Sequence, residues 1–111
     1  MRATFCPAFL LLLLACDKQP PPDIIDPAQL LFLGYTKKSV NCARCHGPAG
    51  QGGMFAPDIR KALRKYDEGE VVEFIRNGKG IGKEAMPGFG EDLTMAEIEL
   101  LLGYLRKIQI K

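Results

Sequence analysis

Apolar residues recur at helical spacing in several stretches of this 111-residue chain, and no stretch alternates in the way of a half-buried strand. The clearest helix begins after Thr94, which forms a capping-box pattern with Glu97. Its apolar stripe consists of Ile98, Leu101, Leu102 and Leu105. A second capping-box pair, Asp67 and Glu70, predicts another helix over about residues 68–76.

Two further helices are predicted nearer the N-terminus. Asp26 is a suitable N-cap and Pro27 a suitable first residue for a helix that continues through Gly34 to about Lys38. A glycine inside a helix costs about 1 kcal/mol relative to alanine, so we expect Gly34 to allow another helix to approach closely. A short helix is expected over residues 59–66. The pattern predicts an all-α fold of about four helices.

The N-terminal segment differs from the rest of the chain. Residues 5–14 are almost entirely apolar, follow Arg2, and are too few to span a bilayer as a helix, which predicts a signal peptide over residues 1–15. An alanine precedes Cys16, and this ending resembles the lipobox of bacterial lipoproteins, in which the cysteine receives lipid. Asp17 then favours retention in the inner membrane, by resemblance to the sorting rule of enteric bacteria. An ordinary signal peptide with an incidental Cys16 is the alternative.

Residues 16–26 are polar and contain three consecutive prolines, which favour an extended polyproline conformation. At about 3.1 Å per residue such a tether spans on the order of 30 Å. Lipid on Cys16 would hold the following domain, residues 27–111, at a membrane surface. We therefore expect an exported domain on the periplasmic side of the cytoplasmic membrane.

The pentapeptide from Cys42 to His46 carries the strongest chemical signal. Two cysteines three positions apart, followed directly by a histidine, form the C-x-x-C-H pattern typical of covalent c-type haem attachment. Cys42 and Cys45 would form thioethers with the porphyrin, and His46 would be the proximal iron ligand.

Three other uses of the cysteine pair are less consistent with the sequence. A structural zinc site needs four ligands, and His46 is the only histidine of the chain. A thioredoxin-like pair is expected near a β-α-β pattern, which is absent from the sequence. A disulfide between Cys42 and Cys45 would close too short a loop to stabilise the fold appreciably. The glycine-rich segment after the motif lacks the lysine of a phosphate-binding loop.

The cysteine count and the charge support this interpretation. Cys6 lies in the predicted signal peptide, Cys16 would carry lipid, and Cys42 and Cys45 would carry haem, which accounts for all four cysteines. The formal net charge of the whole chain is only +2. A charge this small gives no indication of nucleic-acid binding.

A second axial ligand must come from elsewhere in the chain. Met95 falls in the first turn of a predicted helix, and Met54 follows His46 by only eight residues. Met86 follows His46 by 40 residues and occupies a glycine-rich loop before Pro87, which makes it the best candidate. The alternative is that Met86 fills a gap in the core.

Taken together, these motifs resemble those of the class I mono-haem cytochromes c, in a membrane-anchored lipoprotein form. The resemblance covers about residues 34–108. It rests on Cys42-Ala43-Arg44-Cys45-His46-Gly47, Ala56-Pro57-Asp58-Ile59, Phe74-Ile75-Arg76-Asn77-Gly78, Met86-Pro87-Gly88-Phe89 and Tyr104-Leu105-Arg106.

The resemblance implies specific roles for individual residues. Cys42 and Cys45 would bear one haem, and His46 and Met86 would be its axial ligands. The carbonyl of Pro57 would accept a hydrogen bond from the other imidazole nitrogen of His46. Gly34 would contact Tyr104 where the first and last helices cross.

The resemblance implies one-electron transfer, not catalysis, by a monomer. Electrons would pass to and from redox proteins at the haem edge near Arg44. Lys79 and Lys83 could steer an acidic partner. Two other functions stay open. Without Met86 as a ligand, a five-coordinate haem could sense a gas or act as a weak peroxidase. The domain could also be a cytochrome subunit of a larger oxidoreductase complex.

Overall fold

The computed structural model describes residues 19–82 and 85–111, so residues 1–15, Cys16 and Lys83 lie outside the part described. Its helices are α2 (Pro27–Phe32), α3 (Ala43–His46), α4 (Ala62–Lys65), α5 (Glu68–Asn77) and α6 (Met95–Ile108). Within these ranges the only strand-like pairing is an isolated antiparallel bridge between Lys79 and Met86. The all-α prediction is confirmed, and the helix that was not predicted is α3.

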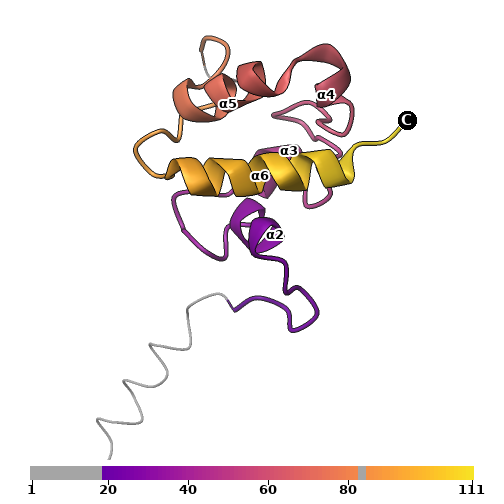
Figure 1. Ribbon diagram of the computed structural model, residues 1–111, viewed down its shortest axis with the longest axis vertical. Coiled ribbons are helices and arrows are strands. Elements are labelled where there is room, and N and C mark those ends of the chain that lie inside the picture. Colours follow the sequence, from indigo (N-terminus) through magenta and orange to yellow (C-terminus); the bar gives the residue numbers. More distant parts are fainter. Residues whose placement is uncertain (1–18, 83–84) are drawn as a thin grey trace, which may run out of the picture.

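Helix α6 is the platform on which α2 and α5 pack. Figure 1 shows α2 crossing one side of α6, and α5 running along the other side. The side toward α2 buries Leu31, Phe32, Ile98, Leu101 and Tyr104, and the rings of Phe32 and Tyr104 lie 4.9 Å apart. The side toward α5 buries Val71, Leu102 and Leu105. The apolar stripe predicted for the last helix is therefore divided between two neighbours.

The predicted helix starts are present as hydrogen-bonded caps. Asp26 Oδ1 accepts a hydrogen bond from the backbone of Ala28 at 3.0 Å, and both capping boxes are complete. Glu97 has a second role, because its Oε1 also accepts a hydrogen bond from Lys37 Nζ at 2.9 Å. The backbone N–H of Thr94 and the ammonium of Lys37 together lower the pKa of Glu97. This cap therefore joins α6 to the chain that follows α2.

The predicted extent of the first helix was wrong. Helix α2 ends at Phe32 because Gly34 adopts a φ of +85°, a left-handed conformation that ends the helix. A Cβ on Gly34 would lie 2.7 Å from Cγ of Asn41, so the absent side chain makes room for Asn41. The ring that packs against Tyr104, tilted by 44°, is that of Phe32, two residues before the glycine.

No helix in residues 19–82 or 85–111 is long and apolar enough to cross a bilayer.

We predict that Glu97→Gln lowers the free energy of unfolding at neutral pH, because the variant keeps an oxygen acceptor but loses the charge. A carboxylate whose folded pKa lies below its ordinary value stabilises the fold above that value, and this stabilisation is lost as the pH falls through the folded pKa. The difference between variant and wild type should therefore vanish in urea unfolding at pH values well below 4.5.

Glu99→Gln, at an exposed position of the same helix, is the matched control. A Glu97→Gln effect that stays constant into acid would contradict the electrostatic explanation.

Candidate functional site

The C-x-x-C-H motif forms a single helical turn. The carbonyl of Cys42 accepts hydrogen bonds from the backbone N–H groups of Cys45, at 3.3 Å, and His46, at 3.0 Å. Residues three and four positions apart lie on the same side of a helix, so the two thiols and the imidazole project from the same side of this turn. Asn41 Oδ1 accepts a hydrogen bond from Arg44 N at 3.1 Å and satisfies a donor at the helix start. This is the asparagine for which Gly34 makes room.

Both cysteines of the motif are free thiols in the structure. Cys42 is half-buried and Cys45 is exposed. Burial raises the pKa of the Cys42 thiol to about 11, so it is protonated at neutral pH. Two reduced thiols are the form that addition to the vinyl groups of a porphyrin requires.

The imidazole of His46 is held through one of its nitrogens. Its Nδ1 lies 3.0 Å from the carbonyl oxygen of Pro57, which is the contact that the family resemblance implies. A carbonyl can only accept, so Nδ1 must carry the proton and donate it to this bond. The lone pair is then on Nε2, which has no hydrogen bond to any part of the chain that the structure describes. A ring held in this tautomer is suited to ligate a metal through Nε2.

A close approach of two backbone segments creates this contact. Gly52 N donates a hydrogen bond to the carbonyl of His46 at 2.6 Å. A Cβ on Gly52, whose φ is +86°, would lie only 2.6 Å from the backbone nitrogen of Asp58. Gly52 therefore lets the segment that carries Pro57 reach His46. The sequence shows that this segment is rich in glycine, but it does not indicate which backbone passes beside Gly52.

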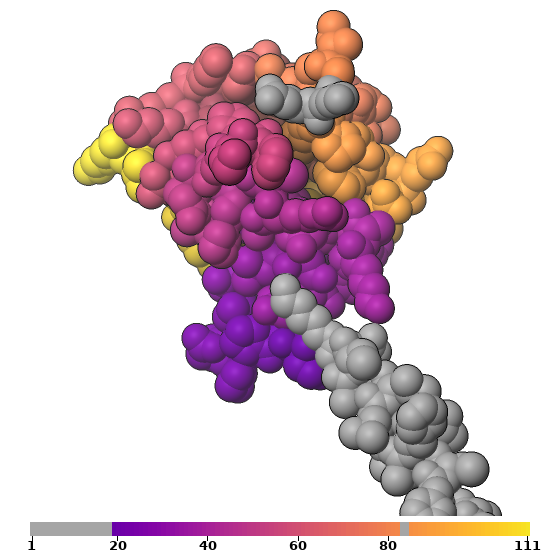
Figure 2. Space-filling view, turned by 180° about the vertical axis from the view of Figure 1, so that it is seen from behind, coloured from indigo at the N-terminus to yellow at the C-terminus, as the bar shows by residue number. Residues whose placement is uncertain are grey.

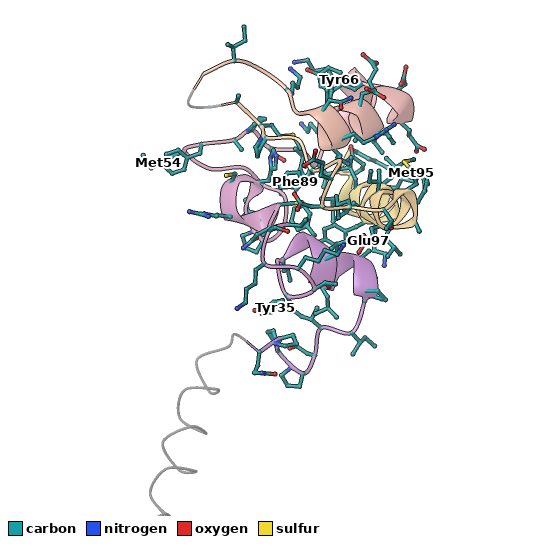
Figure 3. All side chains as sticks on the ribbon, turned by 90° about the vertical axis from the view of Figure 1, so that its left-hand side faces the viewer. Tyr35, Met54, Tyr66, Phe89, Met95 and Glu97 are labelled. Atoms are coloured by element: carbon teal, nitrogen blue, oxygen red, sulfur yellow. The ribbon has the colours of Figure 1, made fainter. Side chains whose placement is uncertain are left out.

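Met86, the predicted second ligand, belongs to a separate part of the chain. Its backbone pairs with that of Lys79 through two hydrogen bonds, of 2.8 and 3.0 Å. The next residues are fastened to the end of α5, where Phe89 N donates to the carbonyl of Ile75 at 2.8 Å. In Figure 3 this segment, the loop with Met54 and helix α3 lie on the same side of α6. Figure 2 shows the orange surface after residue 84 beside the magenta surface that follows the motif.

The three methionines lie in different environments. Met54 is 91% exposed at a loop tip, and Met95 is 51% exposed in the first turn of α6. Met86 is half-buried. The sequence favours Met86 as the ligand, from its spacing and its loop.

The residues of this site fit a haem. The donor set is chemically suitable, with two free thiols and an imidazole whose Nε2 is available. Three large apolar side chains on the neighbouring loops are also largely exposed, as expected where a large apolar group would cover part of the chain. They are Met54, Phe55 and Ile81, with exposures of 91%, 68% and 99%.

Of the two lysines predicted to steer a partner, the structure describes only Lys79. Lys83 lies outside the described residues. The ammonium of Lys79 lies over two aromatic rings, 5.2 Å from the centroid of Phe74 and 5.5 Å from that of Tyr66. No sequence pattern indicated this contact, because it joins residues 5 to 13 positions apart across a loop.

Comparisons with known proteins agree with the site. The family model described as cytochrome c oxidase, cbb3-type, subunit III matches residues 34–105. Cytochrome c-553I of Paracoccus denitrificans is 36% identical over 63 residues, which are 53% of this chain and 28% of the relative. The cbb3-type cytochrome c oxidase subunit CcoP of Azospirillum sp. (strain B510) is 32% identical over 84 residues, which are 68% of this chain and 27% of the relative.

A solved structure is also similar. The crystal structure of the c-type cytochrome XoxG from Methylobacterium extorquens AM1 superposes with a TM-score of 0.56 at 30% identity, and covers 71% of this chain and 50% of that one. The chain matches little more than a quarter of the length of its two curated relatives, 28% and 27%.

We predict that Gly52→Ala sharply lowers the yield of covalently attached haem in cells that mature c-type cytochromes. The added methyl group would meet backbone atoms, which cannot move aside, and a φ of +86° is unfavourable for alanine. The segment with Pro57 would be displaced from His46. The measurement is haem staining of the denatured protein, normalised to the amount of chain.

Gly53→Ala is the matched control. A Cβ at Gly53 would meet only the carbonyl oxygen of Cys45, at an ordinary 3.6 Å, and its φ is not positive. Equal haem yields from the two variants would show that the close approach at Gly52 does not matter.

Proposed function

Since the chain belongs to the c-type cytochrome family described as cytochrome c oxidase, cbb3-type, subunit III, we propose that it is a one-electron carrier of a bacterial respiratory or related chain. Cys42 and Cys45 would hold one haem c, and His46 and Met86 would be its axial ligands. The observation that carries this proposal is the 3.0 Å contact between His46 Nδ1 and the carbonyl of Pro57. It supports His46 as a ligand through Nε2.

When bound, a haem with histidine and methionine ligands supplies reversible exchange of a single electron, with no open position for a substrate. The chain holds and orients the ligands. Pro57 fixes the tautomer and the ring direction of His46. The bridge to Lys79 fixes the backbone of Met86, and the bonds to the end of α5 fix the residues that follow it. A methionine held in this way favours electron transfer over gas sensing or peroxidase activity, which require an open position.

We predict that Met86→Ala opens the iron to external ligands. The reduced wild-type protein should show no spectral change with carbon monoxide, and its oxidised form should show the weak long-wavelength sulfur-to-iron band. Met86→Ala should lose that band and bind carbon monoxide rapidly. Absorbance spectra of the matured proteins make both measurements.

Met54→Ala is the control, because Met54 is the highly exposed methionine near the site. Loss of the band in Met54→Ala but not in Met86→Ala would reassign the ligand. Carbon monoxide binding by the wild type would favour the sensor or peroxidase function.

A second candidate is a cytochrome subunit of a larger oxidoreductase complex. It is favoured by the names of the matching family and of CcoP, both of which denote subunits of cbb3-type oxidases. The sequence and the site fit a free shuttle equally well. Copurification from gently solubilised membranes separates the two: a stable complex would indicate a subunit, and a monomer that still exchanges electrons would indicate a shuttle.

We also propose that the domain, residues 27–111, works on the periplasmic side of the cytoplasmic membrane as a lipoprotein. Residues 1–15 would be the signal peptide and residues 16–26 the tether. Export supports the haem assignment, because bacteria attach c-type haem outside the cytoplasm. The tether would join the domain at Asp26, whose Oδ2 lies 3.0 Å from Lys107 Nζ at the end of α6.

We predict that Cys16→Ser releases the domain from the membrane fraction without loss of haem. The serine cannot take the place of the lipid-bearing cysteine, and stable anchoring needs more than one acyl chain. Fractionation of cells that express the variant, followed by haem staining, measures this. Cys6→Ser, inside the predicted signal peptide, should leave the protein in the membrane fraction. Retention of Cys16→Ser in that fraction would contradict lipid anchoring.

A further inference from the structure

We propose that Lys79 is a positioning residue, which holds the methionine segment, residues 85–90, against α5 through its contact with the rings of Tyr66 and Phe74. The inference rests on the proposed role of Met86 as an axial ligand. It assigns Lys79 a task inside the molecule, different from steering a partner.

The backbone of Lys79 is tied directly to that of Met86. Lys79 N donates to the Met86 carbonyl at 3.0 Å, and Met86 N donates to the Lys79 carbonyl at 2.8 Å. These two bonds form the isolated antiparallel bridge at the base of the loop. A residue that fixes Lys79 therefore also fixes the backbone of Met86.

The side chain of Lys79 is fixed in turn by an aromatic pair. Tyr66 and Phe74 meet edge to face, with centroids 4.9 Å apart and planes at 86°. The Lys79 ammonium lies within the range of a cation–π interaction with both rings, at 5.5 Å from Tyr66 and 5.2 Å from Phe74. Figure 3 shows Tyr66 beside α5, the helix from which the loop departs.

The turn before Lys79 directs the side chain back toward this pair. Gly78 ends α5 with a φ of +85°, and its N–H donates to the carbonyl of Phe74 at 2.9 Å. A Cβ on Gly78 would lie 2.5 Å from the Met86 carbonyl, so the loop closes tightly on the helix end. The chain reverses here, and Lys79 comes to lie over a ring of the helix it has just left.

A second lysine provides an internal comparison. Lys65 Nζ lies 5.3 Å from the centroid of Tyr66, so it contacts one of the same rings. The ammonium groups of Lys65 and Lys79 both lower the pKa of the Tyr66 hydroxyl. Lys65 belongs to the last turn of α4, however, and none of its contacts in the described structure reaches the methionine segment. Removing its charge alters the aromatic pair but leaves the bridge to Met86 intact.

The expected consequence is a change in how often the methionine segment opens. An external ligand can take the place of Met86 only in the open state, so its apparent affinity rises in proportion to the open fraction. Loss of a cation–π contact at an exposed site should raise that affinity about two- to fivefold.

The test is a titration of the oxidised, haem-loaded protein with imidazole, followed through loss of the sulfur-to-iron band. Lys79→Gln should bind imidazole about two- to fivefold more tightly than the wild type. Lys79→Arg, which can also stack on the rings, and Lys65→Gln, which changes the net charge equally, should match the wild type. Exchange of the Met86 amide hydrogen should be faster in Lys79→Gln alone.

The outcomes separate this inference from the proposed function. If Met86→Ala loses the sulfur band but Lys79→Gln behaves like Lys65→Gln in both measurements, the positioning role is wrong and the ligand assignment stands. If Lys79→Gln changes only the salt dependence of partner reduction, Lys79 steers a partner and does not hold the loop. If the band does not depend on Met86, the assignment of Met86 as ligand fails and this inference fails with it, whatever the exchange of the Met86 amide shows.

Discussion

The hydrogen bond between His46 and Pro57 is the contact on which the site depends. It fixes the proton on Nδ1 and leaves Nε2 as the nitrogen that can bind iron. The contact joins two backbone segments that are eleven positions apart, and neighbouring contacts hold these segments close together. Gly52 lets the second segment pass, and its N–H binds the carbonyl of His46 itself.

The end of helix α6 holds the segment that follows Pro57 in place. Gln109, at the end of α6, donates from Nε2 to the carbonyl of Ile59 at 2.9 Å and accepts at Oε1 from Leu63 N at 3.1 Å. Ile59 N in turn donates to the carbonyl of Gly50 at 2.9 Å. The glycine-rich loop is thus fastened to the longest helix that the structure describes. A loop with this many glycines needs such anchors, because glycine loses the most conformational freedom on folding.

Different elements hold the motif and the methionine segment through hydrogen bonds. The motif and Pro57 depend on Asn41, the glycine-rich loop and the end of α6. The methionine segment depends on α5, through the bonds to Ile75 and Arg76 and through the rings under Lys79. A carrier of single electrons benefits from ligands that stay in place in both redox states.

The residue pattern was enough to predict haem attachment and most of the helix starts. The C-x-x-C-H motif, the capping boxes and the Met86 loop are local patterns, and local hydrogen bonds follow from them. Contacts in the folded chain set where α2 ends, which backbone lies beside Gly52 and which rings Lys79 contacts. Each of these is fixed by a residue distant along the chain or across a loop, and spacing along the sequence carries no information about such contacts.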